Sequence, residues 1–568
     1  MCDTEQSSNS SWVKNKGTFI FMISKQSGVN TTDHYTFASS CNKIQIFLNG
    51  VIYNNSEEQL IEGFLLQGSD YINKIEGSFV IFLIEGTQFH ILTDKLNSKK
   101  AFYAFVNGIW YVSNNVDALP KNKCQLDLAG LACYLANGVM FNDLTLFKEI
   151  RSAKRASVYS FNNGEISTRC YWNCQFEYSS SSNKPQQQLQ KELELLLFNS
   201  IKSRYASASN KAISLSGGYD SRGILGILHK KIKASNISCF SYALTENPKM
   251  DSDADVAKEL AAKCGYPYQT IESYKGNLVE LLKTNAREGK CVSDFCIELD
   301  VWHRLAASNQ FTDIFTGDEW FGRNNFALNS QEEILGSVYI RGASGIGWLE
   351  NFISKKVYKQ MCHCLNVLTD EIFETTNAFP DPQDKIDFLY IDQRLDHALM
   401  PWRENFLSQA GFIHDPYLDG KILEFIKQLP PHLRKDKLLF KNTIRDMLPD
   451  FFSMKLSTLK DVKPDLQEEL HKHKDLLISL IQGTESRLDS IISKKEILSA
   501  LEQKVTIIKK AKAFSIRVIN YIRRRNKIAD KLFNIFMGRR VVPSMNQDQL
   551  LLRLLVIRIY LTPSPSDN

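Results

Sequence analysis

The sequence predicts an α/β protein in which antiparallel β-sheets come first, a doubly wound parallel sheet follows, and extra helices complete the chain. Three observations support this order. Short apolar runs separated by turn residues fill residues 17–115, strands alternate with helices after residue 211, and about a hundred further residues, rich in helical spacing, follow. A chain of 568 residues is too long for one hydrophobic core, so we expect two or three domains.

The composition is that of an ordinary globular protein, with 43% hydrophobic and 23% charged residues. A net charge of +6 is a mild excess that does not indicate nucleic-acid binding. The cysteines are scattered, which favours reduced thiols over a metal site. The start of the chain has no signal-peptide pattern, and the apolar run Leu550–Leu561 is broken by two arginines. We therefore expect a cytoplasmic protein with no membrane span.

The first hundred residues predict β-hairpins. Apolar runs such as TFIFMIS, KIQIFLNGVIYN, GSFVIFLIEG and AFYAFVNGIWYVS are separated by the turn candidates Asn49-Gly50, Glu85-Gly86 and Asn107-Gly108. A helix is expected at Leu126–Leu135. The Ser/Asn/Pro-rich segment Ser179–Pro185 is the clearest domain boundary.

The stretch KAISLSGGYDSRGILGIL, at Lys211–Leu228, predicts a strand, a glycine turn and the start of a helix. This arrangement forms an anion site, because glycines let backbone N–H groups approach a phosphate and the helix dipole favours negative charge. Ser216 and Ser221 can add hydroxyl donors. Asp220 would repel a bare phosphate, so its presence indicates a bound Mg²⁺ between the two. Neither the Walker A pattern nor the dinucleotide fingerprint is present. The alternative is a turn that only joins a strand to a helix.

Strands at Ile237–Tyr242 and Tyr268–Ile271 alternate with a helix at Asp255–Cys264, as in a parallel doubly wound sheet. Such sheets bind ligands at the carboxyl ends of their strands. A second chemical cluster, FTDIFTGDEWFG, places Thr316-Gly317 and the acids Asp318-Glu319 after another short strand. Asp220 and Asp318 would then face one pyrophosphate from two strand ends, as Mg²⁺ requires. The alternative for the acidic pair is a solvated turn.

These motifs carry a resemblance to a known family. SGGYDS resembles the pyrophosphate-binding loop of ATP pyrophosphatases, and IFLNGVIYN, IEGSFVIFL and LTDKLNSKKAFYAF resemble, in order, the glutaminase domain of class B asparagine synthetases. The resemblance implies a glutaminase-like sandwich of two antiparallel sheets at 1–177. It also implies an ATP-pyrophosphatase domain at 186–465, leaving 466–568 as a helical, basic C-terminal extension.

The glutaminase half departs from the family pattern. The resemblance implies Cys2 as the nucleophile after loss of Met1, but a polar run separates it from the first strand. Val51 stands where the family has a glutamate, and Asn97 stands where a glycine is usual after Asp94. We therefore expect a scaffold or docking domain, with an active glutaminase as the alternative.

The synthetase half continues to about residue 460. AGFIHDPYLDGKILEFIKQLP resembles a family block, with His414 in place of its arginine, and FKNTIRDMLP resembles the family's K-x-x-L-R…L-P helix. The family then places a lysine that contacts phosphate and the acyl intermediate. Lys455 is our candidate, ahead of Lys460, although strict spacing leads to Ser457. The alternative is an exposed loop lysine.

The predicted site therefore has three groups of residues. The catalytic candidates are Lys455 and Glu319, and the metal ligands are Asp220 and Asp318. ATP and Mg²⁺ are the cofactors that the resemblance implies. The nucleotide-binding candidates are Ser214, Ser216, Gly217, Gly218, Asp220, Ser221, Tyr242, Thr316 and Gly317.

The chemistry that fits is ATP-dependent amide formation. A substrate carboxylate is adenylated with release of pyrophosphate, and an amine then displaces AMP. Resemblance to lasso-peptide cyclases and β-lactam synthetases makes isopeptide (macrolactam) ring closure of a lasso-type precursor peptide the leading hypothesis. The alternatives are a glutamine- or ammonia-dependent amidotransferase and a non-catalytic nucleotide-binding relative. The partners would be a peptide or small-molecule carboxylate and a peptidase or leader-peptide-binding protein. The basic segment Gln503–Arg540 is either a partner-binding helix pair or a solvated cap.

Overall fold

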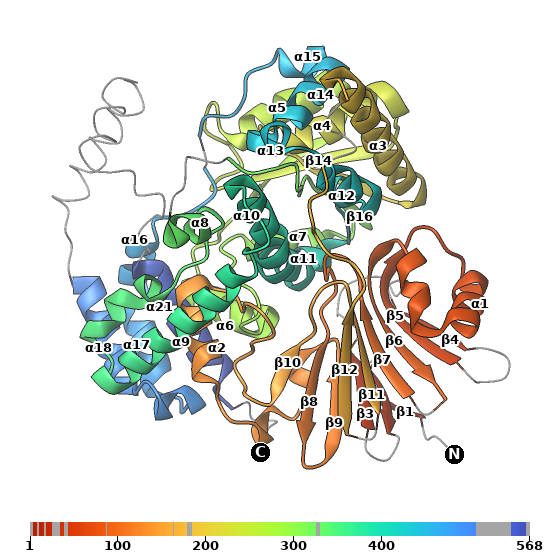
Figure 1. Cartoon of the computed structure of the whole chain (residues 1–568). Coiled ribbons are helices and arrows are strands. Elements are labelled where there is room, and N and C mark those ends of the chain that lie inside the picture. Colours follow the sequence, from red (N-terminus) through yellow and green to blue (C-terminus); the bar gives the residue numbers. More distant parts are fainter. Residues whose placement is uncertain are drawn as a thin grey trace.

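The computed structural model describes residues 4–7, 11–15, 19–24, 34–38, 44–86, 88–162, 164–178, 184–324, 330–459, 461–506 and 547–563. Cys2, Lys460 and the basic clusters between Gln503 and Arg540 lie outside the described residues. Figure 1 shows β-sheets in the N-terminal part, a sheet with helices in the middle of the chain, and a group of helices at the side.

The N-terminal part contains two six-stranded sheets, ordered β1-β2-β3-β9-β8-β10 and β12-β11-β7-β6-β5-β4. Every pair is antiparallel except β3 with β9. Phe21 and Val112 of the first sheet and Phe82 and Ile91 of the second belong to one buried cluster, so the sheets form a sandwich. The strands are β1 (Thr4–Ser7), β2 (Ser11–Asn15), β3 (Phe19–Ser24), β4 (His34–Ala38), β5 (Ile44–Ile52), β6 (Gly77–Glu85), β7 (Gln88–Thr93), β8 (Phe102–Val106), β9 (Ile109–Ser113), β10 (Ile150–Ser152), β11 (Ser157–Asn162) and β12 (Glu165–Cys170).

One predicted turn is wrong. Asn49-Gly50 lies inside β5, which runs unbroken from Ile44 to Ile52 and pairs along its length with β6. Gly50 has φ of +117°, and a Cβ there would lie 2.0 Å from the backbone oxygen of Ser78. The glycine therefore permits a close approach of two strands, a role that a dipeptide read as a turn does not reveal.

The second sheet has five parallel strands in the order β15-β14-β13-β16-β17, which confirms the predicted fold class. Ile213 belongs to one buried cluster and Ala212 to another, so helices cover both faces of the sheet. The chain runs outward from β13 in one direction and resumes at β16 on its other side, which makes the β13–β16 boundary the topological switch point. The strands are β13 (Lys211–Ser214), β14 (Ile237–Ala243), β15 (Tyr268–Glu272), β16 (Asp313–Phe315) and β17 (Phe412–His414).

Helices build the rest of the described chain. The principal ones are α1 (Glu57–Gln67), α2 (Leu128–Asn137), α3 (Gln186–Ser207), α4 (Asp220–Gly226), α5 (Asp253–Cys264), α6 (Leu278–Gly289), α7 (Leu299–Ser308), α8 (Gln331–Ser337), α9 (Lys355–Glu374), α10 (Pro382–Leu389), α11 (Met400–Asn405), α12 (Gly420–Lys427), α13 (Pro431–Arg434), α14 (Leu438–Met447), α15 (Pro449–Phe452), α16 (Leu466–Lys472), α17 (Lys474–Gln482), α18 (Lys494–Thr506) and α21 (Gln547–Tyr560). A π-helical segment at Tyr390–Leu399 joins α10 to α11. Among these described helices, none combines the length and apolarity needed to cross a membrane.

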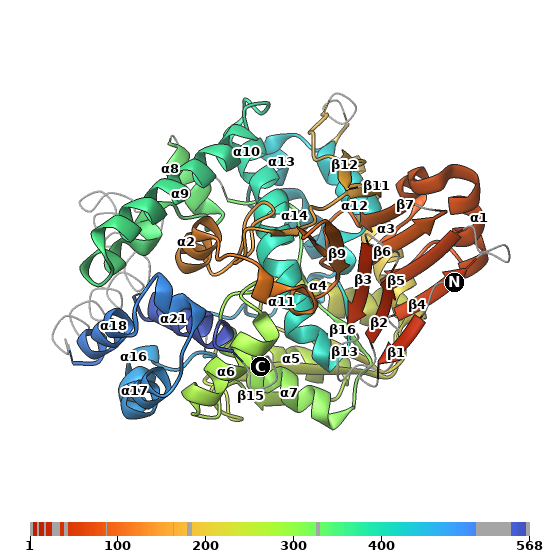
Figure 2. The same cartoon turned by 90° about the horizontal axis from the view of Figure 1, so that it is seen from below.

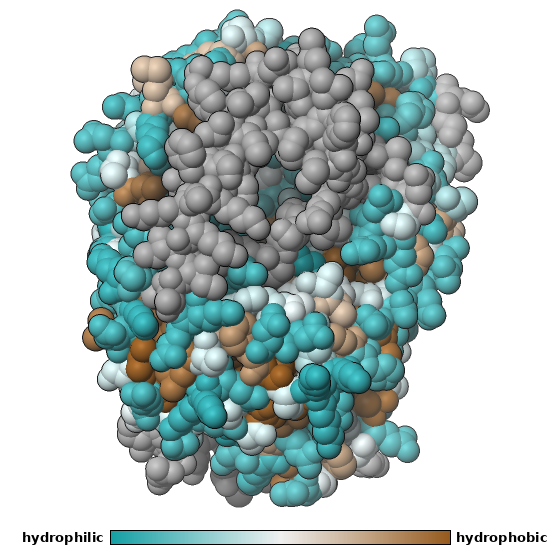
Figure 3. All heavy atoms as spheres, turned by 90° about the vertical axis from the view of Figure 1, so that its left-hand side faces the viewer, coloured by the Kyte–Doolittle hydropathy of each residue, from teal (hydrophilic) through white to brown (hydrophobic). Residues whose placement is uncertain are grey.

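The helix α21 is the centre of the C-terminal helical group. Its residues from Leu550 to Arg558 are all buried, and it packs on α2, α6, α16 and α18. Figure 2 shows α21 among these helices, close to α6. The outer face of the molecule on this side carries hydrophobic side chains in separate spots among hydrophilic ones (Figure 3). Because the residues from Leu550 to Arg558 are buried all round the helix, α21 belongs to the core of this group and not to its surface.

Candidate functional site

The SGGYDS loop follows β13 at the switch point and is held by its own hydroxyl groups. The backbone N–H of Ser216 donates to the Ser221 Oγ at 3.0 Å, and the N–H of Gly218 donates to the Ser216 Oγ at 3.3 Å. The two hydroxyl oxygens lie 3.1 Å apart. The predicted donors are thus brought together at the amino end of α4, the position where an anion is stabilised. Ser214 ends β13 directly before them.

Gly217 lies against the segment that follows α15. A Cβ at Gly217 would lie 2.5 Å from the Cβ of Ser457, so only glycine fits there without displacement. The Gly217 N–H donates to the Asp253 Oδ1 at 3.2 Å, and the Ser457 hydroxyl donates to the same oxygen at 2.5 Å. A loop N–H that the sequence assigned to phosphate therefore already contacts a carboxylate oxygen.

Asp220 and Glu319 share one cation, Lys437. The Lys437 Nζ lies 2.9 Å from the Asp220 Oδ2 and 2.8 Å from the Glu319 Oε1. Burial raises the pKa of Asp220 to about 6, and the neighbouring Glu319 acts in the same direction. Burial opposes the charge of Lys437, but Glu319 and Asp220 outweigh burial and raise its pKa above the usual value. Asp220 and Glu319, which come from two different loops, are thereby joined.

Asp318 belongs to a second ion cluster beside the first. The Arg403 guanidinium binds both of its oxygens, with Nε–Oδ2 at 2.6 Å and Nη2–Oδ1 at 3.0 Å. The Thr316 hydroxyl donates to Asp415, and burial followed by the nearby Asp318 raises the pKa of Asp415 to about 6. The two clusters meet at Gly317, where a Cβ would lie 2.9 Å from the Cβ of Asp220.

Two predicted residues lie apart from these clusters. Tyr242, in β14, packs edge-on against Trp302 with ring centroids 5.4 Å apart. Lys455 is exposed, and its Nζ lies 2.9 Å from Asp251 and 3.2 Å from Glu259 rather than beside Asp220. The structure places Lys437 where the sequence argument placed Lys455.

Sequence reasoning missed Lys437, Arg403 and Asp415. A signal existed for Lys437, because Lys437-x-x-Phe440-Lys441 resembles the K-x-x-L-R pattern one helical turn before Lys441. Arg403 and Asp415 carried none, because Arg403 lies on a helix far along the chain from Asp318 and Asp415 was read only as part of a family block.

Comparisons with known proteins match two regions of the chain to known families. The family model for a glutamine amidotransferase domain matches residues 26–172, and the asparagine synthase model matches residues 192–336. The chain thus contains one region similar to glutamine amidotransferase domains and one similar to asparagine synthases. Its asparagine synthase domain supports an ATP-dependent ligase that forms amide bonds. The search of curated proteins found no match.

Two solved structures share distant similarity with this chain. The U34-tRNA thiolase NcsA from Methanococcus maripaludis, solved with its 4Fe-4S cluster, is 14% identical over 59% of this chain and 84% of its own, with a TM-score of 0.24. The glutamine phosphoribosylpyrophosphate amidotransferase from B. subtilis, complexed with ADP and GMP, is 12% identical over 42% of this chain and 47% of its own, with a TM-score of 0.16. At such TM-scores neither similarity supports an inference about this chain.

The candidate site has the donor types that Mg²⁺ requires. Among the described residues no three carboxylate, histidine or cysteine side chains converge into a complete metal site. Mg²⁺ is usually held by one or two carboxylates together with substrate phosphates and water, so Asp220 and Asp318 suffice in number and chemistry. Burial raises the pKa of Asp220, and Glu319 acts in the same direction, so a bound cation would stabilise the charged carboxylate. These residues therefore fit the ion.

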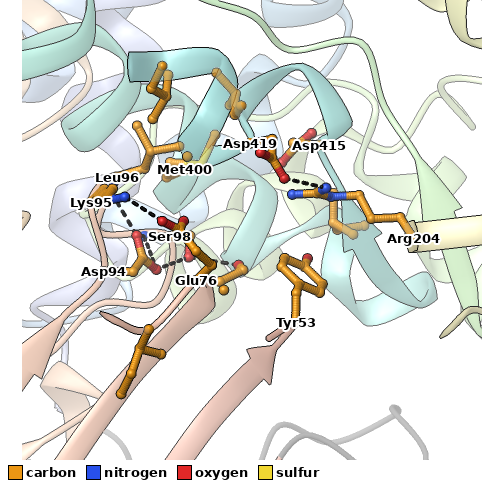
Figure 4. Close-up of a pocket in the computed structure, with 17 residues that line it drawn as sticks. Tyr53, Glu76, Asp94, Lys95, Leu96, Ser98, Arg204, Met400, Asp415 and Asp419 are labelled. Atoms are coloured by element: carbon orange, nitrogen blue, oxygen red, sulfur yellow. Dashed lines mark hydrogen bonds and ion pairs between the residues drawn. The ribbon is translucent and has the colours of Figure 1, made fainter. Parts of the chain in front are cut away.

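A pocket of about 50 Å³ lies between the amidotransferase domain and the asparagine synthase domain (Figure 4). Arg204 lies over the ring of Tyr53 at 4.4 Å and pairs with Asp419 at 2.9 Å, and the Lys95 Nζ lies 2.7 Å from Glu76. Charged pairs from both domains thus line the walls. The volume has room for a few water molecules.

Asp94, which follows β7, is held by backbone groups of β6 and of its own loop. Its oxygens accept hydrogen bonds from the backbone N–H of Phe79 at 2.8 Å and of Leu96 at 2.7 Å. The rest of the loop contacts the other domain. The Asn97 amide donates to Asp396 at 2.9 Å, and Lys99 pairs with Glu404, the neighbour of Arg403. The loop at residues 94–100 therefore forms a contact between the two domains.

Proposed function

We propose that the chain is an AMP-forming amide ligase that uses ATP to adenylate a substrate carboxylate. The carboxylate oxygen attacks the α-phosphate and pyrophosphate leaves. An amine then attacks the acyl carbon, AMP leaves, and the amine gives up a proton. The observation that carries this proposal is the meeting of the SGGYDS loop with the Asp318-Glu319 loop at the switch point, where Lys437 bridges Asp220 and Glu319.

Each polar group of the site has a role in this proposal that follows from its position. The loop N–H groups and the hydroxyls of Ser216 and Ser221 would hold the leaving pyrophosphate. Lys437 would move from Asp220 and Glu319 toward the phosphates as negative charge develops there. Arg403 keeps Asp318 in one orientation through two hydrogen bonds. A Mg²⁺ ion held by Asp220 and Asp318 would neutralise phosphate charge.

We further propose that the carboxylate and the amine belong to one peptide, so that the product is a macrolactam ring of the lasso type. The support is the amidotransferase half, in which Val51 replaces a glutamate and Asp94 is engaged by its own loop. The amine would then come from the substrate rather than from glutamine. A partner peptidase or leader-peptide-binding protein belongs to this proposal.

The second candidate function is a glutamine-dependent amidotransferase acting on aspartate or a sugar acid. The matched glutamine amidotransferase domain favours it. The two candidates make opposite predictions for Cys2→Ala. Ring closure is indifferent to this change, whereas glutamine-dependent amidation is abolished while ammonia-dependent amidation persists.

ATP–pyrophosphate exchange tests the proposal, measured with pools of linear peptides and with free aspartate. We expect peptide-dependent exchange that survives Cys2→Ala and falls at least about a hundredfold in Asp220→Asn and Lys437→Met. Lys455→Met is the matched control, with activity within about threefold, because its Nζ is exposed and lies among other acids. Exchange with aspartate alone would move the assignment to the second candidate. No exchange or pyrophosphate release with any acceptor would leave a non-catalytic nucleotide-binding relative.

A further inference from the structure

Arg222 directly follows the SGGYDS motif, in the first turn of α4, and is completely buried with 0% exposure. Its guanidinium donates four hydrogen bonds, and every acceptor is a backbone oxygen. The acceptors are Phe451 at 3.0 Å, Met454 at 3.0 Å, Lys455 at 2.7 Å and Gly217 at 2.9 Å. One side chain therefore ties the loop to the segment after α14.

The charge of Arg222 has no counter-ion. Within the part of the chain that the structure describes, no carboxylate lies within ion-pair distance of it, and its Nε has no partner. Three other arginines are buried to 2% exposure or less, and each is paired with an aspartate: Arg434 with Asp384, Arg553 with Asp294 and Arg558 with Asp489. An unpaired buried charge is expensive and needs a reason.

The hydrogen bond to Gly217 sets the direction of the next amide. In a planar trans peptide the C=O and the following N–H point in opposite directions. Because the Gly217 oxygen faces Arg222, the Gly218 N–H faces the other way, toward the Ser216 Oγ at 3.3 Å. Arg222 thereby holds a donor toward the side of the loop where a phosphate would bind.

We propose that Arg222 is a positioning residue. It fixes the pyrophosphate loop through its hydrogen bond to the Gly217 oxygen, and it places beside the loop a positive charge that no carboxylate among the described residues pairs with. The inference rests on the proposed function, because pyrophosphate is the anion that this loop would release. The role is specific to the pyrophosphate half of ATP, so AMP binding is not involved.

The experiment compares two probes, inorganic pyrophosphate and AMP, bound to the full chain and measured by calorimetry. In Arg222→Gln we expect pyrophosphate affinity to fall at least about tenfold, the scale of one charge-assisted interaction, with AMP affinity within about twofold. Arg445→Gln is the matched control, because it removes the same charge from an exposed arginine that donates to Tyr219 of the same loop. This control should leave both affinities within about twofold.

A merely structural role would lower both affinities together with the unfolding midpoint, and that result would overturn the proposal. Unchanged pyrophosphate affinity in Arg222→Gln would also overturn it while leaving the proposed function intact. If the wild-type chain binds no pyrophosphate, both the role of Arg222 and the proposed function are wrong. If Arg222→Gln does not fold, Arg222→Lys is the second test. Pyrophosphate affinity within about threefold of wild type would support a role for the positive charge, and a loss of about tenfold would contradict it.

Discussion

Carboxylates outnumber the cations that touch them in the candidate site. Asp220 and Glu319 share Lys437, and Asp318 takes both hydrogen bonds from Arg403. Among the residues that the structure describes, the close-range partner of the Asp415 carboxylate is the hydroxyl group of Thr316. At the scale of single residues, the site therefore has an excess of negative charge, which a bound cation or a proton can neutralise.

Asp415→Asn tests this stored charge through pH. The pKa of Asp415 is raised from 3.8 to about 6, so its favourable contribution to stability is present below pH 3.8 and is lost as pH rises through 6. The amide keeps an acceptor for Thr316 without the charge. We expect the variant to unfold at least about 2 °C above wild type at pH 7.5, with the difference shrinking toward pH 4.5. A difference that is constant with pH in fluorescence-monitored melting would contradict the assignment.

The sequence was informative for residues whose partners lie in the same motif. SGGYDS located Ser216, Asp220 and Ser221 because a strand, a turn and a helix dictate where a phosphate binds. Lys455 and Lys437 both follow plausible sequence patterns, and only the fold shows that the Lys437 Nζ faces Asp220. Arg403 could not be found because its partner Asp318 lies on a distant strand end.

At the scale of elements, two loops must pack tightly at the switch point. The loop after β16 crosses the loop after β13 at Gly317, where a Cβ would lie 3.0 Å from the backbone nitrogen of Ser221. Apolar runs sufficed to predict the strands on both sides. They could not predict the crossing, nor that Gly50 lies within a strand, because both depend on contacts with other strands and loops.

Gly317→Ala should therefore separate the two loops. We expect ATP affinity to fall about tenfold with little change in the unfolding midpoint, because the backbone must shift by a few tenths of an ångström or more to accept the methyl group. Gly347→Ala is the control, since a Cβ there meets nothing within 4 Å. Equal ATP affinity in both variants would show that the crossing does not shape the site.

At the scale of the whole molecule, the helical group depends on α21. Arg553 of this helix donates to the backbone oxygens of Leu135 and Ala136 and pairs with Asp294 at 2.6 Å. It thus joins residues from the first, second and last thirds of the chain. The sequence predicted helices here but treated them as an extension, because helical periodicity does not reveal which helix is central.

Arg553→Met should destabilise the fold by about 3–5 kcal/mol, because it leaves the Asp294 carboxylate without its partner. Adding Asp294→Asn should recover part of this loss, as measured in denaturant unfolding of the full chain. Lys494→Met is the control, because its ion pair with Glu485 is exposed and contributes little. Strictly additive effects of the two changes would mean that the pair is not coupled.

The burial of α21 has a consequence for biosynthesis. The helix α2, at Leu128–Asn137, leaves the ribosome long before its neighbour α21, at Gln547–Tyr560, has been made. The apolar face of α2, like those of α6 and α18, therefore stays uncovered during synthesis until α21 has been made. A chain that ends before α21 would expose the apolar side chains of α2 and α6 that α21 buries.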